Sequence, residues 1–125
     1  VRVTRKDGAG VSRIKNLGIR ILILSSEKNK VVSARAHKLG VECIQNVANK
    51  ELTLDRYLKS VGLSKEHVWA IGNDLNDIGM FKHAKIKLCP QDADKFILKI
   101  CDFIIPLKGG EGILKYLAEY LEKSL

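Results

Sequence analysis

The sequence predicts an α/β protein, specifically a Rossmann-like three-layer sandwich with a parallel sheet. Short apolar runs rich in Ile, Val and Leu alternate along the chain with segments of helical periodicity, as in a sheet that is covered on both faces. Three helical segments end in similar phrases, KNLGI, HKLGV and KSVGL, where a glycine with positive φ closes the last turn. Strict alternation of strands and helices implies parallel strands joined by right-handed crossovers.

Each element follows from the spacing of the apolar residues and from the glycine stops. We expect helices over residues 11–17, 29–39, 51–61, 75–83, 93–100 and 111–122. We expect strands over residues 19–24, 41–44, 68–71, 86–88 and 103–105. Asp92 is the expected N-cap of the helix that starts at residue 93. With 125 residues, 46% of them hydrophobic, the chain suits a single domain over residues 1–125 with a buried core.

The composition argues against several classes of protein. The net charge is +8, but the basic residues are scattered and no zinc-finger or RNP-type motif is present, so we do not expect a nucleic-acid-binding protein. The longest apolar stretch, IRILIL, is short and contains Arg20, so we expect neither a membrane span nor a signal peptide. Three cysteines without a C-x-x-C pair indicate buried thiols in a reducing compartment. We therefore expect a cytoplasmic protein.

Polar residues follow the predicted strands, at the edge where this fold class binds its ligands. In chain order they are Ser25-Ser26-Glu27, then Gln45-Asn46 with Lys50 soon after, then Gly72-Asn73-Asp74-Leu75-Asn76-Asp77, then Cys89-Pro90-Gln91-Asp92. A hydroxyl beside free backbone amides suits a phosphoryl oxygen. A lysine neutralises charge during phosphoryl transfer, and clustered side-chain oxygens suit Mg²⁺. Together these residues predict a phosphate site with a metal ion.

Each of these residues also has a plain structural reading. Ser25 or Ser26 would cap the next helix, and Lys50 would be a solvated lysine like most others. Asp74 and Asp77 would favour a helix N-terminus through its dipole. Their shared position on one edge of the predicted sheet favours the phosphate site over the separate structural readings. The three histidines form no convergent set, and we assign them no role.

The order of these residues resembles the haloacid dehalogenase superfamily of phosphotransferases. Ser25, Lys50 and G-N-D-x-N-D at 72–77 resemble its second, third and fourth motifs. Further phrases resemble its cap-less sugar-acid phosphatases, which act on 3-deoxy-D-manno-octulosonate 8-phosphate or on nonulosonate (sialic acid type) 9-phosphates. These phrases are KDGAG at 6–10, ARAHKLG at 34–40, QNVANK at 45–50 and GGEG at 109–112. The resemblance covers essentially the whole chain, and some such modules are fused to a cytidylyltransferase.

The resemblance implies a Mg²⁺-dependent phosphoric monoester hydrolase and a role for each matching residue. The implied catalytic residues are Ser25, which binds the transferring phosphoryl group, Lys50, which balances charge, and Asp77, which supports Lys50. Asn73 and Asp74 are the implied metal ligands. The implied substrate-binding residues are Ser26, Glu27, Arg35 and Lys38. Octulosonate enzymes usually carry an arginine at the position of Glu27, so Glu27 favours a nine-carbon substrate, with the eight-carbon sugar acid next.

Two departures from the family pattern stand out. The family's usual metal-binding aspartate directly after the glycine is Asn73 here, and an amide oxygen offers less charge to Mg²⁺. The family's first motif is a strand ending in D-x-D, whose first aspartate is the nucleophile of an aspartyl-phosphate mechanism. The chain aligns after that strand, so we expect an N-terminally incomplete domain with its nucleophile outside these residues. Asp7 is no substitute, because we expect it to precede a glycine turn.

Three functions remain open at this point. The first is a sugar-acid phosphatase of sialic acid or lipopolysaccharide biosynthesis, which would leave a free strand position in the sheet and, by resemblance, would assemble as a homotetramer. The second is a non-catalytic module of an acylneuraminate cytidylyltransferase that serves oligomerisation or regulation. The third is a receiver-type signalling domain, but in receivers the acidic residues come early, whereas here they follow Lys50.

Overall fold

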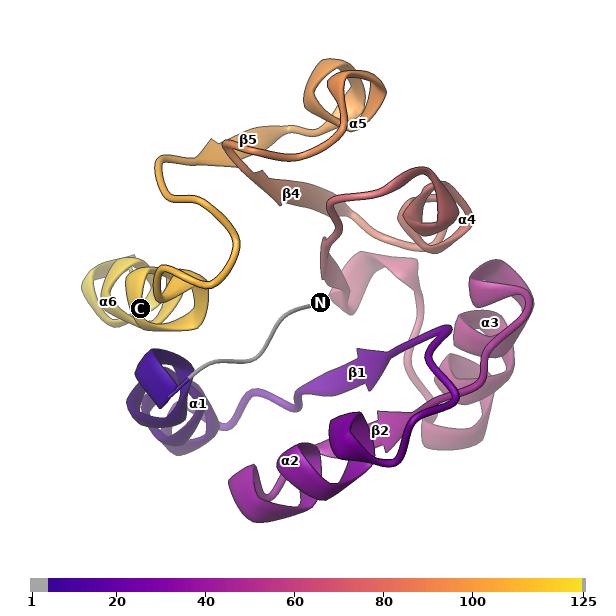
Figure 1. Ribbon diagram of the computed structural model, residues 1–125, viewed down its shortest axis with the longest axis horizontal. Helices are drawn as coiled ribbons and strands as arrows, with labels where there is room; N and C mark the ends of the chain where they lie inside the picture. The colour runs from indigo at the N-terminus through magenta and orange to yellow at the C-terminus, as the bar shows by residue number, and fades with distance from the viewer. Residues whose placement is uncertain (1–4, 125) are drawn as a thin grey trace. The chain divides into compact units, whose positions relative to one another are not determined.

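The computed structural model describes residues 5–124 and confirms the α/β fold with parallel sheets. Figure 1 shows the alternating elements. The helices are α1 Arg5–Asn16, α2 Val31–Leu39, α3 Lys50–Val61, α4 Ile78–Phe81, α5 Lys95–Ile100 and α6 Ile113–Ser124, with short 3₁₀ helices η1 Lys65–His67 and η2 Leu75–Asp77. The strands are β1 Leu22–Leu24, β2 Glu42–Ile44, β3 Trp69–Ile71, β4 Ile86–Pro90 and β5 Phe103–Ile105.

The strands within the described residues form two parallel sheets. Strands β1 and β2 pair in one sheet, with Leu22 opposite Glu42 and Leu24 opposite Ile44. The other sheet has the order β3-β4-β5. The described residues group into two compact units: unit 1 runs up to Val47 and resumes at Gly109, and unit 2 covers Ala48–Lys108. Each unit thus contains one sheet with its own helices.

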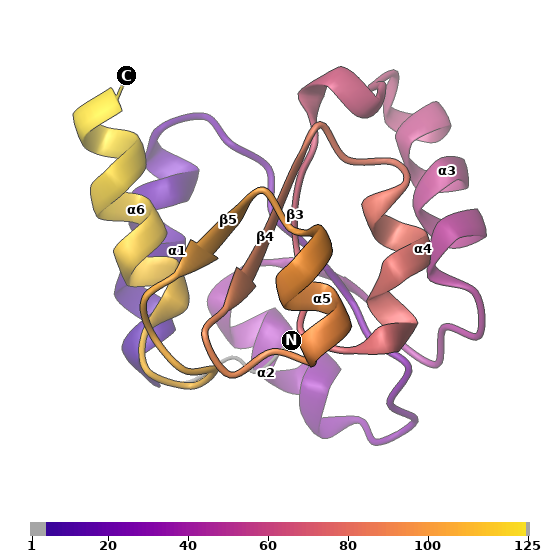
Figure 2. The same cartoon turned by 90° about the horizontal axis from the view of Figure 1, so that it is seen from above.

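Unit 1 has a core to which each of its first four elements contributes. Val11 of α1, Ile23 of β1, Ala36 of α2 and Val41 before β2 are buried in one cluster. Helices α1 and α6 lie side by side, as Figures 1 and 2 show. A Cβ on Gly10 of α1 would come within 2.5 Å of the backbone of α6 at Leu114. The absence of a side chain at Gly10 therefore allows the two helix backbones to approach this closely.

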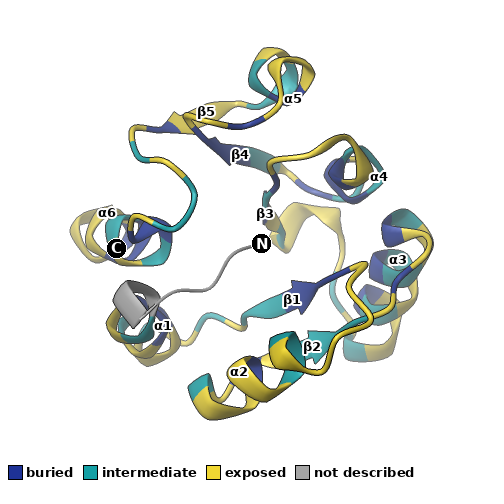
Figure 3. Ribbon diagram, in the orientation of Figure 1, coloured by how far each residue is buried: buried dark blue, intermediate teal, exposed yellow. Residues whose placement is uncertain are grey.

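Unit 2 packs helices against the three-stranded sheet and against one another. Helix α4 lies beside α3: a Cβ on Gly79 would be 3.0 Å from Cβ of Glu51, and Lys82 pairs with the Glu51 carboxylate at 3.5 Å. Burial is concentrated on the inner sides of these elements, as Figure 3 shows. The fully buried side chains of unit 2 include Phe81, Cys89, Ile97 and Ile105. None of the helices in residues 5–124 is long and apolar enough to cross a membrane.

The glycine stops were predicted correctly. Gly18, Gly40 and Gly62 all have positive φ, at 81°, 68° and 72°. At Gly40 and Gly62 the backbone amide donates to carbonyls in the last turn of the preceding helix. These contacts are those expected of a left-handed residue that ends a helix.

Several boundaries differ from the sequence-based expectation. Strand β1 begins at Leu22 and not at residue 19, because its partner β2 begins only at Glu42. The N-cap of α5 is Asp94, whose carboxylate accepts a hydrogen bond from the Phe96 amide at 2.8 Å, so Asp92 was wrong by two residues. The expected glycine turn after Asp7 is also wrong, because Asp7 lies within α1.

We predict that Gly10→Ala lowers the free energy of unfolding by about 1–3 kcal/mol, because the new methyl group would overlap the backbone of α6. Gly8→Ala is the matched control in the same helix. Its Cβ would lie 3.6 Å from Leu39 Cδ2, an ordinary contact, and alanine favours a helix over glycine by about 1 kcal/mol. Urea denaturation of both variants measures the difference. Equal stability of the two variants would contradict the close approach at Gly10.

Candidate active site

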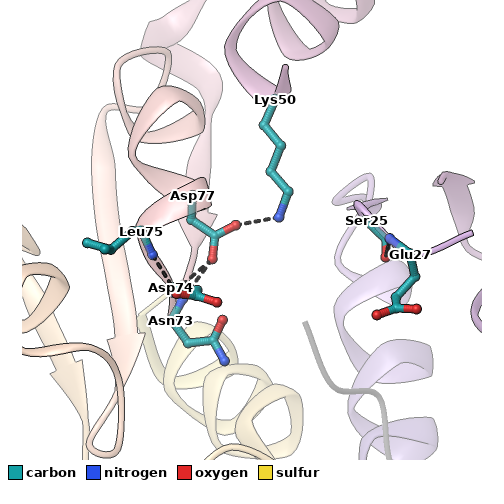
Figure 4. A network of polar contacts seen from close by, with 7 residues as sticks. All are labelled: Ser25, Glu27, Lys50, Asn73, Asp74, Leu75 and Asp77. Atoms are coloured by element: carbon teal, nitrogen blue, oxygen red, sulfur yellow. Dashed lines mark hydrogen bonds and ion pairs between the residues drawn. The ribbon is translucent and has the colours of Figure 1, made fainter. Parts of the chain in front are cut away.

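Lys50 and Asp77 form a buried ion pair in unit 2. The Lys50 Nζ atom donates to Asp77 Oδ1 at 2.6 Å, and the two residues are 8% and 1% exposed. Figure 4 shows the pair and the backbone contacts around it. Asn49 is the N-cap of α3: its side-chain oxygen accepts from the Leu52 amide at 3.0 Å. This cap makes Lys50 the first helical residue, one position before the expected start at residue 51, and fixes the point from which its side chain leaves α3.

Asp77 also holds the loop that follows β3. Its Oδ2 atom accepts hydrogen bonds from the backbone amides of Asn73 at 2.9 Å and Asp74 at 3.2 Å. Gly72, at the start of the loop, has no room for a side chain, because a Cβ there would lie 2.7 Å from Cβ of Asp77. The expected helix over 75–83 is therefore divided into η2 and the short α4, with Asp77 turned back onto the loop.

These contacts compensate for the hydration that Lys50 and Asp77 lose when their charged groups are buried. A buried charge destabilises a protein unless it is paired and hydrogen-bonded. The Asp77 carboxylate accepts from one ammonium and two amides, so both of its oxygens are used. The contact that the family resemblance implied between Asp77 and Lys50 is therefore present, and each carboxylate oxygen of Asp77 has a partner.

Asn73 and Asp74 are the side chains of this loop that could hold a metal ion. Both are exposed, and their amide and carboxylate oxygens are the donors that Mg²⁺ prefers. One oxygen of Asp74 already accepts from the Leu75 amide at 2.8 Å. Within residues 5–124 no group of three or more His, Cys, Asp and Glu could hold a metal ion. The two side chains thus fit Mg²⁺ as a partial ligand set that other oxygens would have to complete.

Ser25 directly follows β1 in unit 1 and is held by β2 and by the residues after it. Its amide donates to the Ile44 carbonyl at 3.0 Å, and its carbonyl accepts from the Val47 amide at 3.0 Å. Its hydroxyl oxygen accepts from the Glu27 amide at 3.1 Å. The reading of Ser25 or Ser26 as a helix cap is wrong, because Lys30 is the N-cap of α2 and makes no side-chain cap bond.

Gln45 is a residue to which the sequence-based reasoning gave no role. Its side-chain nitrogen donates to the carbonyls of Glu27 at 3.1 Å and Asn29 at 2.7 Å. The amide of Asn46, which has a positive φ of 57°, donates to the same Glu27 carbonyl at 2.9 Å. The loop over residues 25–29 is therefore fixed by the residues that follow β2. A polar residue directly after a strand, in the phrase QNVANK, was the available signal.

The structure brings the predicted site residues together in two groups. Unit 2 gathers Lys50, Asn73, Asp74 and Asp77 around one buried carboxylate. Unit 1 carries the remaining predicted residues, Ser25, Ser26 and Glu27 in the loop after β1 and Arg35 and Lys38 on α2. Of these, Ser25 is buried and the others are exposed. The catalytic and binding roles of both groups stay predictions.

We predict that Gln45→Met loosens the loop over residues 25–29, because methionine keeps the length of the side chain and removes both donors. The variant should lose about 1–2 kcal/mol of unfolding free energy, and amides of this loop should exchange with solvent faster in a hydrogen-exchange measurement. Gln91→Met, on an exposed side chain, is the matched control and should change neither quantity. Unchanged exchange in Gln45→Met would contradict the anchoring role of Gln45.

Comparisons with known proteins identify the family of this chain. A family model described as haloacid dehalogenase-like hydrolase matches residues 12–117. The 3-deoxy-D-manno-octulosonate 8-phosphate phosphatase of Salmonella typhi is 25% identical over 117 residues, which are 93% of this chain and 62% of that protein. The chain thus spans less than two thirds of this relative's length.

Two solved structures show the same fold. A phosphatase for the same octulosonate ester from Moraxella catarrhalis, in complex with magnesium, phosphate and the sugar acid, has a TM-score of 0.90 at 26% identity, covering 97% of this chain and 70% of that one. A hydrolase from Streptomyces avermitilis has a TM-score of 0.90 at 30% identity, covering 94% and 68%. Because the family model matches most of its length, the chain belongs to the haloacid dehalogenase-like hydrolases.

Proposed function

We propose that this chain supplies most of the active site of a Mg²⁺-dependent phosphatase. Its substrate is the phosphate ester of a 2-keto-3-deoxy sugar acid. The observation that carries the proposal is the buried Lys50–Asp77 pair beside the exposed oxygens of Asn73 and Asp74. Burying a lysine at the start of a helix is unusual without a function that needs a positive charge at a fixed place. Relatives of the same family are named as sugar-acid phosphatases, which supports this substrate class.

Lys50 balances negative charge as the phosphoryl group moves. Asp77 is a positioning residue: it holds the ammonium group at 2.6 Å and the amides of Asn73 and Asp74 at the same time. Ser25 binds a phosphoryl oxygen through its hydroxyl hydrogen, since its oxygen already accepts from the Glu27 amide. The Ser26 amide assists it.

Mg²⁺ would be held by Asn73 and Asp74, with water and phosphate oxygens completing its shell, and it would neutralise charge on the phosphoryl group. The nucleophile is an aspartate outside this chain. Its carboxylate oxygen would form a bond to phosphorus while the ester oxygen leaves with a proton from the second aspartate of the D-x-D motif. That aspartate would then take a proton from the water that hydrolyses the aspartyl phosphate and releases phosphate.

Glu27, Arg35 and Lys38 would face the sugar acid. All three side chains are exposed, and the basic pair suits a carboxylate. Glu27 favours a nonulosonate 9-phosphate, with the octulosonate 8-phosphate next, because a hydrogen-bond acceptor there suits a substrate with additional hydroxyl groups. The enzyme would be a cytoplasmic homotetramer, with the turn at residues 109–112 as a substrate or subunit contact.

One observation favours a second candidate. Asn73 lowers the negative charge offered to a metal ion, which suits a non-catalytic module of an acylneuraminate cytidylyltransferase that serves oligomerisation or regulation. The two candidates differ in one measurable property, the release of phosphate by the natural gene product.

We predict that Lys50→Ala, in a version of the protein that carries the D-x-D strand, lowers kcat by about 10²–10³-fold, because one preorganised charge is lost from the transition state. Phosphate release from nonulosonate 9-phosphate and octulosonate 8-phosphate is the measurement, and chelation of the metal should abolish it. Lys82→Ala is the matched control: this lysine is exposed and pairs with Glu51 at 3.5 Å, so its loss should leave kcat unchanged.

A wild-type rate in Lys50→Ala would contradict the role given to this lysine. No release of phosphate from either ester by the natural gene product would reject the phosphatase and favour the non-catalytic module. Thermal melts of both variants separate a loss of chemistry from a loss of folding.

A further inference from the structure

Cys89 and Cys101 form a pair of thiols within unit 2. Their Sγ atoms are 2.9 Å apart, and both cysteines are free. Cys89 lies on β4 and is 0% exposed. Cys101 follows α5 directly and is only partly buried. The two residues are thus brought together by the α5 crossover between neighbouring strands, and a bond between them would need no change of strand pairing.

From this geometry we infer that Cys89 and Cys101 are a redox-active dithiol, which a hydroperoxide converts to an intramolecular disulfide. The sulfur atoms need to approach by about 0.9 Å to reach the disulfide length of about 2.05 Å. The Cys101 thiol also lies 3.8 Å from the Leu98 carbonyl in the last turn of α5.

The two thiols have different parts in the reaction. Cys101 is the more exposed, so its sulfur meets the peroxide first: the thiol becomes a sulfenic acid, and the peroxide is reduced to water or an alcohol. The Cys89 sulfur then bonds to the Cys101 sulfur and displaces the hydroxyl as water. In total, the two thiols lose two electrons, and one hydroperoxide molecule accepts them. A dithiol reductant reverses the step.

Cys89 is placed to react with the sulfenic acid on Cys101 and is not placed to react with the dissolved peroxide. Burial raises the pKa of the Cys89 thiol to about 12, with the contact to Cys101 adding to the rise. A protonated, buried thiol reacts slowly with a dissolved oxidant. Its reaction with a sulfenic acid on Cys101 is favoured by the 2.9 Å separation of the two sulfur atoms and not by its pKa. Cys43 offers an internal comparison, since its thiol is partly buried in unit 1, outside the unit that contains the pair.

The bond would join the end of α5 to the middle of its sheet. The start of α5 is already tied to the candidate site, because the Asp94 amide donates to the Asn73 carbonyl at 2.9 Å. On the other side, the Leu88 carbonyl next to Cys89 accepts from the Gly72 amide at 3.0 Å. Oxidation should therefore restrict unit 2 in the unfolded state and raise its melting temperature, while leaving the strand register in place.

The test treats the full chain with hydrogen peroxide, removes the peroxide, denatures the chain and alkylates its free thiols. The expected product carries one alkyl group, on Cys43, and a peptide link between Cys89 and Cys101. Its mass before alkylation is lower by about 2 Da, for the two hydrogen atoms removed. It melts at a higher temperature than the reduced chain, and dithiothreitol reverses both changes.

Cys101→Ser and Cys43→Ser are the matched variants. Serine is close to cysteine in size and Cys101 is only partly buried, so Cys101→Ser should fold but form no link and show no rise in melting temperature. Cys43→Ser should form the link as the wild type does. Three alkylated cysteines after peroxide, a sulfinic acid on Cys101 with Cys89 still alkylated, or a link through Cys43 would each overturn the inference.

Discussion

The rest of unit 2 depends on the ion pair between Lys50 and Asp77. It joins the first residue of α3 to the turn after β3 at 2.6 Å, and both groups are almost entirely buried. Removing one partner would leave a charge in a place that water does not reach, which destabilises a protein strongly. The same carboxylate holds the amides of Asn73 and Asp74. The position of the exposed oxygen donors is therefore set by a buried interaction.

The loop after β1 in unit 1 is held in a different way. Its contacts are backbone hydrogen bonds from Ser25, Asn46 and Val47, together with the side-chain amide of Gln45. No charge is buried to make them, so the loop is held by neutral groups whose individual contributions are modest. A buried ion pair suits a fixed charge in phosphoryl transfer, whereas a neutral, hydrogen-bonded loop leaves its exposed side chains available to a polar ligand.

Much of the fold, and the positions of the candidate site residues near the ends of the strands, could be predicted because the signals were local. The glycine stops at Gly40 and Gly62 follow from capping rules alone. The errors arose where distant residues decide the outcome. The sequence around Gly10 predicts a turn, but Gly10 lies within α1 and allows the close packing of α1 on α6. The helix after residue 75 begins as a 3₁₀ turn because Asp77 folds back onto Asn73.

The central claim, that Lys50 and Asp77 act as a coupled pair, is tested most directly by a double-mutant cycle on unfolding. Lys50→Met, Asp77→Leu and the double variant keep similar volumes and remove one or both charges. The loss of the Asn73 and Asp74 contacts is common to both variants that lack Asp77 and cancels. We predict a coupling energy of about 2–3 kcal/mol from chemical denaturation. Additive losses, with a coupling below about 0.5 kcal/mol, would contradict the account.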